Sequence, residues 1–454
     1  MRFILKSLPS YVRNSRKIGL FGLGLSNTGV AEFLSALGDY EFILRSDRAF
    51  DEGNLPEVLK GAVSHVGDGA FACAEENILF LSPSANRKRE DIKRFAEGGV
   101  KLSSDAELFF ELNDKPIFAV SGSDGKSTTT RLTSLLLCGT LFTEECGNCG
   151  RPMTQSLASG ADAYVTELSS FMLDAFIPKS KRAVITSISE NHLDFHGSLD
   201  AYFSAKENLY KGTCEPVIWA DKDFSEGFIK KYPPFALLSA SHSFVELSGL
   251  GAELILTFEN GRILRNGVPI IELSKFKRQE RHNIENFMSA MALSDGYYGS
   301  EHLLAVARSF GGIAHRAELI AIKNGVEYID SSVDSSPTRT ATTLNGLKKR
   351  VILILGGRGK GLSYEPLAEP VCRYARAVIL TGENAEQIKK TLLSCDAFSK
   401  GTIPVYECEN LASAIDEAKE LSRPSDTVLL SPASTSYDEF KNFEERADFF
   451  KKRI

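Results

Sequence analysis

The chain has no long apolar run and no large excess of charge of either sign. Of its 454 residues 43% are hydrophobic, yet its strongest apolar stretches are only short ones, at 351–355, 377–380 and 427–430. A membrane-spanning helix needs roughly 18 apolar residues in a row, so we expect no membrane segment. The 53 Lys and Arg residues nearly balance the 59 Asp and Glu, for a net charge of -6. This balance argues against a dedicated binder of nucleic acids or membrane surfaces.

Several other features are missing as well. Residues 1–17 mix Arg, Lys, Ser and Pro and lack the apolar core and cleavage site of a signal peptide, so we expect a cytoplasmic protein. The eight cysteines are scattered, which favours reduced thiols over a disulfide framework. We find no internal repeat or low-complexity tract. The ordinary proportions of apolar and charged residues exclude a mostly disordered chain, a collagen-like fibre and a coiled coil.

Three well-separated segments share one pattern, in which an apolar run leads directly into a glycine-rich turn. These runs cover residues 17–21, 116–120 and 351–355. Such runs are typical of parallel strands buried on both faces. One hydrophobic core rarely extends past roughly 250–300 residues, so a chain of this length is expected to divide. We predict three α/β domains, with seams near 104–115 and Gly311-Gly312, and hairpins over 235–274 at the side of the middle domain.

The strongest single motif directly follows the second apolar run. It consists of Gly122, Ser123, Asp124, Gly125, Lys126, Ser127 and Thr128. A phosphate loop needs glycines so that backbone N–H groups can surround the anion, a lysine that reaches the outer phosphates, and a hydroxyl that holds Mg²⁺. Val120 stands where the general pattern has another glycine, and a purely structural turn is the alternative. The strand, the two glycines, the lysine and the serine together favour phosphate binding.

The first glycine-rich turn, Gly22 to Gly29, also follows an apolar run. It is close to a dinucleotide-binding fingerprint, but its third glycine is two places late. The acidic residue expected further along the chain is met only loosely, by Asp47. A contact to a phosphate or nucleotide-sugar and a purely structural turn are therefore about equally supported.

Charged side chains follow two further predicted strands. Glu167 stands at a strand end, where a carboxylate could hold a metal ion or its bound water, although isolated acids are more often solvated or paired. His192 and His196 flank Asp194 beyond the next strand, which suggests a metal or phosphate site. Lys206 lies on a helical stretch, and taken alone it predicts only a solvated lysine.

Other segments offer polar groups with two interpretations each. Cys146 and Cys149 have redox-type spacing, but the loop continues where a redox motif would open a helix, and Asn148 fits a loop residue that offers an amide to a ligand. Asn283 and Asn286 share one face of a helix start, where they either cap the helix or contact an adenine edge.

The third glycine-rich turn carries Lys360, which by default is a solvated loop lysine. The segment 431–436 offers hydroxyls and a helix start after a strand, with simple N-capping as the alternative.

The order of these motifs resembles that of the Mur ligases of peptidoglycan synthesis, from about Gly22 to the C-terminus. The resemblance rests on Gly-Ser-Asp-Gly-Lys-Ser-Thr, Gly-Asn-Cys-Gly-Arg-Pro, Glu-Leu-Ser-Ser-Phe, Asn-His-Leu-Asp-Phe-His-Gly, Ala-Lys-Glu-Asn, Arg-His-Asn-Ile-Glu-Asn, His-Arg, Gly-Gly-Arg-Gly-Lys-Gly and the block from Leu429 to Arg446. Ser431 to Arg446 is most specific to the members that add D-glutamate. The Asp-Asn-Pro-Arg signature of the members that add a diamino acid is absent from the sequence.

This resemblance implies an α/β fold of three domains. A Rossmann-like domain over 1–106 would bind the UDP-sugar, a central P-loop ATPase domain over 107–312 would bind ATP, and a Rossmann-like domain over 313–454 would bind the amino acid. It also implies a monomeric enzyme that uses ATP and Mg²⁺. ATP would phosphorylate the terminal carboxylate of UDP-N-acetylmuramoyl-L-alanine, and the amine of D-glutamate would attack the acyl phosphate to give an amide, ADP and phosphate.

The resemblance further implies roles for single residues. Ser127 and Glu167 would hold a first Mg²⁺ and His192 a second, and Lys206 corresponds to a lysine that becomes a metal-binding carbamate. The catalytic residues implied are Lys126, His192 and Lys206. The nucleotide contacts implied, beyond the phosphate loop, are Asn283, Asn286, Arg316 and Asp330. The D-glutamate contacts implied are Lys360, Ser436 and Phe443. The UDP-sugar contacts implied are Leu25, Ser26, Ser46, Arg48 and Asn148.

Two positions depart from the family pattern. By motif, the position of the family's nucleotide-contacting acid is occupied by Asp330. Counting back from Pro337 instead places Ser331 at that position, and Asp334 is a third choice. Asp124 replaces an asparagine that is common in the loop, which puts a negative charge close to ATP. We expect activity nonetheless, because the metal and lysine positions are intact.

Three other functions stay open at this stage. Another amide ligase of the same fold, such as folylpolyglutamate synthetase or a different muramoyl ligase, keeps the chemistry but changes the substrate. A nucleotide-binding regulatory or scaffold protein keeps the fold without turnover. The third alternative, a dinucleotide-dependent oxidoreductase, is supported only by the turn from Gly22 to Gly29.

Overall fold

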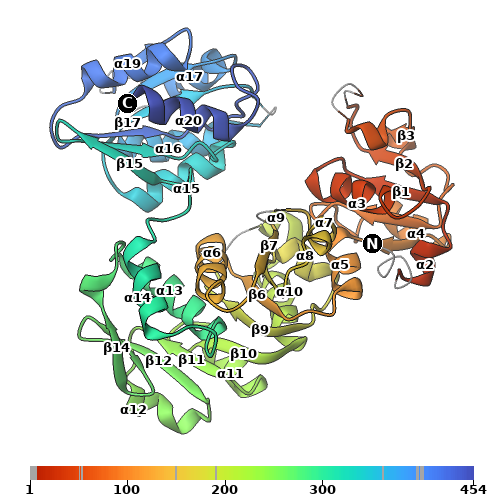
Figure 1. Cartoon of the computed structure of the whole chain (residues 1–454). Coiled ribbons are helices and arrows are strands. Elements are labelled where there is room, and N and C mark those ends of the chain that lie inside the picture. The colour runs from red at the N-terminus through yellow and green to blue at the C-terminus, as the bar shows by residue number, and fades with distance from the viewer. Residues whose placement is uncertain are drawn as a thin grey trace. The chain divides into compact units, whose positions relative to one another are not determined.

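Three sheets of five, nine and six strands follow one another along the part of the chain that the structure describes (Figure 1). The structure is a computed structural model that describes residues 8–50, 52, 55–148, 151–189, 192–359, 362–394, 398 and 403–454, with backbone alone at 193 and 194. The chain divides into two compact units, residues 1–310 and 311–454. The first unit holds the five- and nine-stranded sheets, and the second holds the six-stranded sheet.

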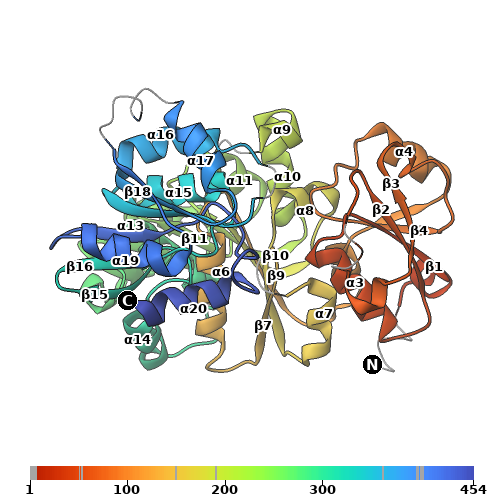
Figure 2. The same ribbon diagram turned by 90° about the horizontal axis from the view of Figure 1, so that it is seen from above.

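The first sheet is parallel throughout, in the order β3-β2-β1-β4-β5. Its strands are β1 (Lys17–Phe21), β2 (Glu41–Ser46), β3 (Val63–Val66), β4 (Ile78–Leu81) and β5 (Lys101–Ser103). Side chains alternate between the faces of a strand. Leu20 therefore packs with residues of α3 (Leu25–Ser35), and Phe21 packs with residues of α4 (Glu90–Glu97). Figure 2 shows α3 and α4 on opposite sides of this sheet. Two more helices here are α2 (Ser10–Arg13) and α5 (Asp105–Leu112).

The second sheet has the order β14-β13-β12-β11-β10-β9-β6-β8-β7. Its strands are β6 (Ile117–Ser121), β7 (Thr143–Gly147), β8 (Ala163–Glu167), β9 (Ser180–Ile185), β10 (Thr213–Trp219), β11 (Ala236–Ser239), β12 (Leu254–Glu259), β13 (Arg262–Arg265) and β14 (Val268–Glu272). The strands from β7 to β12 pair in parallel, whereas β12, β13 and β14 form antiparallel hairpins. The hairpins predicted over 235–274 are therefore confirmed for 254–272, whereas 236–239 forms the parallel strand β11 and a short helix follows it.

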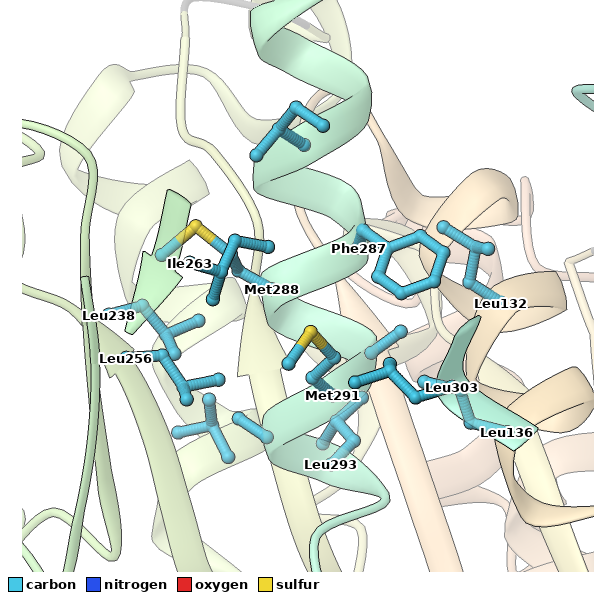
Figure 3. Packing of buried hydrophobic residues seen from close by; sticks show 14 of the residues in the cluster. Leu132, Leu136, Leu238, Leu256, Ile263, Phe287, Met288, Met291, Leu293 and Leu303 are labelled. Carbon is cyan, nitrogen blue, oxygen red and sulfur yellow. The ribbon is translucent and has the colours of Figure 1, made fainter. Parts of the chain in front are cut away.

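Helices cover both faces of this sheet. One face packs against α6 (Lys126–Leu137), α13 (Arg281–Leu293) and α14 (Ser300–Ser309). In Figure 3, Phe287 and Met291 of α13 lie among Leu132, Leu136 and Leu303, with strand residues on the other side of the helix. The opposite face packs against α7 (Met153–Ser156), α8 (Ser170–Ala175), α10 (Leu199–Lys211), α11 (Ser225–Lys231) and α12 (Phe244–Leu247), and α9 (Leu193–His196) precedes α10.

The third sheet has the order β15-β16-β20-β17-β18-β19, parallel except for the β15–β16 pair. Its strands are β15 (Glu318–Lys323), β16 (Val326–Asp330), β17 (Val351–Gly356), β18 (Ala375–Thr381), β19 (Val405–Glu407) and β20 (Thr427–Leu430). One face packs against α15 (Pro337–Leu347), α16 (Glu365–Tyr374) and α17 (Ala385–Leu393). The other packs against α19 (Leu411–Leu421) and α20 (Phe443–Arg453).

The predicted α/β class and the three glycine-rich turns at strand ends are confirmed, since the turns follow β1, β6 and β17. Among the described residues, no helix is both long enough and apolar enough to cross a membrane. The domain bounds at 106 and 312 stay predictions. The helix start expected at 431–436 is wrong, because no helix begins there and α20 begins only at Phe443, with Asn442 as its N-cap.

Candidate active site

The predicted phosphate loop lies between β6 and α6. Gly122 and Gly125 have φ angles of 145° and 80°, which side-chain-bearing residues rarely adopt. A Cβ on Gly125 would come within 2.3 Å of Asn286 Oδ1. A Cβ on Gly122 would come within 2.1 Å of Thr186 Oγ1. Both glycines are therefore required by conformation and by space.

The ammonium of Lys126 lies against this loop. Its Nζ donates to Gly122 O at 2.9 Å and to Ser123 O at 2.7 Å. The positive end of the helix dipole of α6 lies at the same place, because Lys126 is the first residue of the helix. A lysine and a helix N-terminus that follows a glycine-rich turn form a binding site for the phosphates of a nucleotide.

The segment after β9 holds the outer side of the loop. Ser123 N donates to Ser187 O at 2.8 Å, and Asp124 N donates to Ser187 Oγ at 2.9 Å. Ser123 Oγ lies 2.7 Å from the hydroxyl of Tyr202 on α10. The loop conformation is thus fixed by two distant parts of the chain, which motif spacing alone did not reveal.

Glu167, at the end of β8, is a buried carboxylate with one unused oxygen. The residue is 1% exposed, and its Oε1 accepts from Asn148 Nδ2 at 2.6 Å. Its Oε2 is buried and has no hydrogen-bond partner among the described residues. An unpaired buried carboxylate oxygen is costly unless a ligand satisfies it. The available Oε2 suits a cation, while Asn148 satisfies the other oxygen of the carboxylate.

Lys206 is also buried, with 1% exposure on α10. The solvated helix face that its local sequence predicts is therefore wrong. Its Nζ lies 3.5 Å from Ser121 Oγ and 4.8 Å from the ring centroid of Tyr202. Burial, and next the charge of Lys126, lower the pKa of Lys206 to about 7. A substantial fraction of this amine is therefore neutral at neutral pH, which is the form that reacts with CO₂.

The two predicted histidines differ in environment. His196 is 6% exposed, with Nε2 3.0 Å from Ser170 Oγ, and burial lowers the pKa of its ring. His192 is exposed, with a φ of 54° and its ring 4.7 Å from that of Phe171. The side chain of Asp194 lies outside the described residues. His192 is therefore the histidine that is accessible to a ligand.

Both predicted adenine-site asparagines lie in the first turns of α13. The N-cap of this helix is Glu280, so the alternative that an asparagine caps it is wrong. Asn286 Oδ1 lies 3.4 Å from Thr129 Oγ1 on α6, beside Gly125, and Asn283 Nδ2 donates to Glu280 Oε2 at 3.0 Å. The structure therefore brings Asn286 against the phosphate loop, 161 positions away from Gly125 in the sequence.

The second unit gathers the other predicted nucleotide contacts around the end of β16. Asp330 is fully buried, and its Oδ2 lies 2.7 Å from His315 Nδ1. Its Oδ1 accepts from Ser332 N at 2.9 Å. Arg316, the next residue after His315, is exposed. Asp330 therefore orders this turn through His315, while the exposed Arg316 is the residue accessible to a nucleotide.

The other two choices for the nucleotide-contacting acid are buried as well. Ser331 is 0% exposed and its Oγ accepts from Ala317 N at 3.1 Å. Asp334 is 3% exposed and its Oδ2 accepts from Ser431 Oγ at 2.7 Å. The choice among the three residues stays open.

Two of the predicted D-glutamate contacts, Ser436 and Phe443, lie after β20 in the same unit. Ser436 is 3% exposed, and Phe443 begins α20 with its ring centroid 6.0 Å from that of His315. Lys360 lies outside the described residues. The structure thus brings Phe443 next to the turn that carries Arg316.

Sequence reasoning missed Arg446, which is only 3% exposed. Its Nη2 donates to Ser332 O at 2.9 Å and to Ser434 O at 3.1 Å. Burial lowers the pKa of this guanidinium to about 10, and its Nε and Nη1 have no partner among the described residues. Arg446 joins the turn after β16 to the turn after β20. Arg446 ends the motif block from Ser431, but the sequence of that block gives no sign that this arginine is buried.

The predicted UDP-sugar contacts other than Asn148 lie beside the first sheet, after the ends of β1 and β2. Leu25 begins α3 and is 78% exposed. Ser46 Oγ donates to Arg48 O at 2.7 Å, and Arg48 is exposed. Ser26 lines a pocket whose wall also includes Ser82, Arg87, Asp105 and Phe171. The first glycine-rich turn therefore borders a pocket.

The cysteine pair with redox-type spacing shows no sign of that chemistry where it is described. Cys146 is fully buried within β7, and burial raises the pKa of its thiol. Cys149 lies outside the described residues.

Comparisons with known proteins agree with this arrangement. Residues 120–294 match the Mur ligase middle domain, and residues 315–434 match the glutamate ligase domain of Mur ligases. The chain is 33% identical to a protein named UDP-N-acetylmuramoylalanine--D-glutamate ligase from Acetivibrio thermocellus, over 99% of this chain and 98% of that one. A protein of the same name from Clostridium novyi is 32% identical over 100% of this chain and 99% of its own.

Solved structures show the same fold at low sequence identity. UDP-N-acetylmuramate-alanine ligase MurC from Thermotoga maritima has a TM-score of 0.57 at 18% identity, covering 96% of this chain and 98% of that one. MurF from Acinetobacter baumannii has a TM-score of 0.54 at 14% identity, covering 95% and 93%. The resemblance read from the motifs is confirmed, and the chain belongs to the Mur ligase family.

Proposed function

We propose that the protein is an ATP-dependent ligase of peptidoglycan precursor synthesis, which adds D-glutamate to UDP-N-acetylmuramoyl-L-alanine. The observation that carries this proposal is a group of three side chains beside the second sheet, the partly buried Lys126 of α6 and the buried Glu167 of β8 and Lys206 of α10. One oxygen of Glu167 has no partner among the described residues, and the pKa of Lys206 is lowered to about 7. Relatives that are 32–33% identical over nearly the whole chain carry the name of this ligase.

The reaction begins with a carboxylate, which is a poor acyl donor because its leaving group would be an oxide. An oxygen of the terminal L-alanine carboxylate attacks the γ-phosphorus of ATP, and ADP leaves. The resulting acyl phosphate is attacked at carbon by the amine of D-glutamate. The amide forms, the amine loses a proton, and phosphate departs with the former carboxylate oxygen.

Lys126 serves this step by neutralising charge on the transferring phosphoryl group. It lies at the N-terminus of α6, where backbone N–H groups and the helix dipole favour the same charge. Ser123 N and Asp124 N donate to Ser187, so these two N–H groups of the loop are not available to the phosphates. Catalysis in phosphoryl transfer consists mainly of such positioning and charge stabilisation.

The residues present fit the Mg²⁺ that the family implies. Glu167 Oε2 is an unsatisfied hard oxygen ligand, and Ser127 follows the loop lysine, as in other phosphate loops. His192 is accessible for a second ion. A bound Mg²⁺ would supply positive charge that stabilises the negative charge of the transferring phosphoryl group and so lowers the barrier to transfer. An ammonium at Lys206 would repel a cation, whereas its carbamate would attract one.

The carbamate follows from simple chemistry at Lys206. The ammonium first loses a proton, and the neutral amine then adds to CO₂, forming a carbon–nitrogen bond and releasing a second proton. The group thereby changes from a cation to an anion. Burial, which disfavours the ammonium, keeps the reactive form available. We propose that the carbamate replaces an unfavourable buried cation with a metal-binding anion.

We also propose a division of tasks among three regions. Residues 1–106 bind the UDP-sugar through Leu25, Ser26, Ser46 and Arg48, with Asn148 contacting the muramoyl part. Residues 107–312 bind ATP and the metal. Residues 313–454 bind D-glutamate through Lys360, Ser436 and Phe443, and the nucleotide through Arg316. We further propose that the enzyme is a monomer and acts in the cytoplasm.

The test is phosphate release from ATP and UDP-N-acetylmuramoyl-L-alanine with a panel of amino acids. Release with D-glutamate alone is the expected result. Release with L-lysine or L-glutamate but not with D-glutamate would point to another ligase of this fold. ATP binding with no amide for any acceptor would support a scaffold role and contradict the proposal. NAD-dependent turnover would support the oxidoreductase alternative and contradict the proposal.

A further inference from the structure

A separate group of metal-ligand side chains lies on the first sheet, among residues that have no role in the proposed reaction. It consists of His65 on β3, and of Cys73 and Glu75 in the segment that leads into β4. One ligand atom from each residue lies within 4.8 Å of the others. His65 Nε2 and Glu75 Oε1 are only 3.1 Å apart. Three different donor atoms from two separate elements therefore converge on one place.

A buried ion pair holds the backbone that carries two of these ligands. Arg45 Nε lies 2.6 Å from Glu76 Oε1, and both side chains are 0% exposed. Arg45 Nη2 also donates to Cys73 O at 2.8 Å. A charged pair this deeply buried is expensive to break, because removing one partner leaves the other charge unpaired. The positions of Cys73 and Glu75 are thus tied to β2 through Arg45.

The strand register places His65 on the same face as this ion pair. Arg45 and His65 are direct partners in the parallel β2–β3 pair, so their side chains point to one side of the sheet. Gly19 on β1 leaves the space that the pair needs, since a Cβ there would come within 2.3 Å of Glu76 Oε1. The face is therefore shaped to hold the segment carrying Cys73 and Glu75 against the edge strand.

Lys17 orients the carboxylate of the group. Its Nζ donates to Glu75 Oε2 at 3.1 Å, which leaves Oε1 facing His65. Outer partners of this kind commonly fix the orientation of a metal-ligating carboxylate. The ligand set of a neutral imidazole, a thiolate and a carboxylate carries two negative charges, which match a divalent cation.

The donor chemistry selects the class of metal. A thiolate favours soft or borderline ions over Mg²⁺ and Ca²⁺, and sites built from Cys, His and Glu are typical of Zn²⁺. Bond lengths of about 2.0–2.3 Å place the ligand atoms of tetrahedral Zn²⁺ roughly 3.3–3.8 Å apart. The His65–Glu75 separation is close to this range, and the exposed Cys73 side chain can rotate into it.

We propose that His65, Cys73 and Glu75 form a zinc site, with water as the fourth ligand. Binding deprotonates the Cys73 thiol and releases that proton to solvent. The ion ties the edge strand β3 to the segment before β4, and it thereby stabilises the first sheet. The site is distinct from the Mg²⁺ ligands of the proposed reaction and does not depend on that reaction.

The test uses the full-length, metal-free protein titrated with Co²⁺ alone, and then with Zn²⁺ as competitor. We expect one equivalent of Co²⁺ to produce a thiolate-to-cobalt charge-transfer band and tetrahedral visible bands, which Zn²⁺ abolishes. Cys73→Ser should remove the charge-transfer band, and His65→Gln and Glu75→Gln should each weaken Co²⁺ affinity at least about tenfold. Cys214→Ser, which changes another exposed cysteine, should leave the titration as in the wild type.

Thermal unfolding gives an independent readout. Zn²⁺ should raise the melting temperature of the wild type and of Cys214→Ser but not that of Cys73→Ser, because a ligand stabilises only the state that binds it. No charge-transfer band in the wild type, or an unchanged band in Cys73→Ser, would overturn the proposal. Equal stabilisation of all three proteins by Zn²⁺ would also overturn it.

Discussion

Asn148 donates its side-chain Nδ2 to Glu167 Oε1 at 2.6 Å and leaves Oε2, among the described residues, without a partner. This hydrogen bond orients the carboxylate so that Oε2 stays available to a cation. Glu167→Gln keeps the shape of the side chain but removes its charge, and we expect kcat to fall at least ~100-fold, or about 2.7 kcal/mol. The Mg²⁺ concentration for half-maximal activity should rise as well.

The matched control for Glu167 is Glu145→Gln, on the neighbouring strand β7. Glu145 pairs with Arg131 at 2.7 Å and touches no proposed ligand, so its kcat should stay close to that of the wild type. Asn148→Ala should cost less than Glu167→Gln, roughly tenfold in kcat/KM, because the charge remains. Unchanged Mg²⁺ dependence in Glu167→Gln would show that this carboxylate binds no metal.

Lys206→Ala should abolish turnover, because the carbamate has no other attachment point. Added bicarbonate or acetate should partly restore phosphate release, since a small anion can occupy the space that the side chain leaves. The measurement is kcat across a bicarbonate series, with sodium chloride at matched ionic strength as the control. Full activity of Lys206→Ala in CO₂-free buffer would defeat the carbamate interpretation.

The lowered pKa of Lys206, at about 7, also predicts how stability depends on pH. Below pH 7 the group is protonated in both the folded and unfolded states, and its burial destabilises the fold to a constant extent. Between pH 7 and the unfolded pKa near 10.4, the unfolded state binds more protons, so the stability of the folded state rises by up to about 1.4 kcal/mol per pH unit.

Lys206→Met should therefore be more stable than the wild type near pH 6, with the difference shrinking toward pH 10. Urea unfolding in metal-free and CO₂-free buffer would measure this through Trp219, the single tryptophan, which is buried on β10. Lys211→Met changes an exposed lysine on the same helix and should show a difference that is flat over this range. A flat profile for Lys206→Met would contradict the lowered pKa.

Gly125 and Gly160 allow a matched comparison, because their φ angles are 80° and 74°. A Cβ on Gly160 meets nothing within 4 Å, so Gly160→Ala should cost only the left-handed conformation, about 1 kcal/mol. Gly125→Ala adds a clash with Asn286 and should raise the KM for ATP at least about tenfold. ATP titration and unfolding followed by Trp219 fluorescence measure both effects. An equal KM for the two variants would show that the loop does not bind the nucleotide.

Arg446 links the turns after β16 and β20 through two carbonyl oxygens, Ser332 O and Ser434 O. Arg446→Met removes both hydrogen bonds but relieves the burial of a charge, so stability should change little. The KM for D-glutamate should rise roughly tenfold, while the binding of UDP-sugar stays unchanged. Arg453→Met, on the same helix with an exposed ion pair to Asp416, is the control. A loss of stability without a change in KM would make Arg446 purely structural.

Local patterns were sufficient for features that depend on neighbours in the sequence. Apolar runs located β1, β6 and β17, and the loop before Lys126 followed from glycine spacing, because strand burial and phosphate binding both leave short-range signatures. Glu167 was correctly placed at a strand end for the same reason.

Long-range contacts were beyond such reasoning. The burial of Lys206 depends on the packing of α10 against the sheet, and its local sequence indicates a solvated residue. The pairs Asn286–Gly125 and Arg45–Glu76 join positions far apart in the chain, so no spacing rule could identify them. The segment 431–436 offers hydroxyls after a strand, which predicts a helix start there, yet α20 begins only at Phe443.

The most direct test of the central claim is the fate of oxygen-18 placed in the terminal alanine carboxylate of UDP-N-acetylmuramoyl-L-alanine. With ATP and D-glutamate, we predict that each amide formed releases one phosphate that carries one labelled oxygen. That result requires the acyl phosphate and ligation to occur together in this protein. Unlabelled phosphate, or no amide of D-glutamate, would contradict the account.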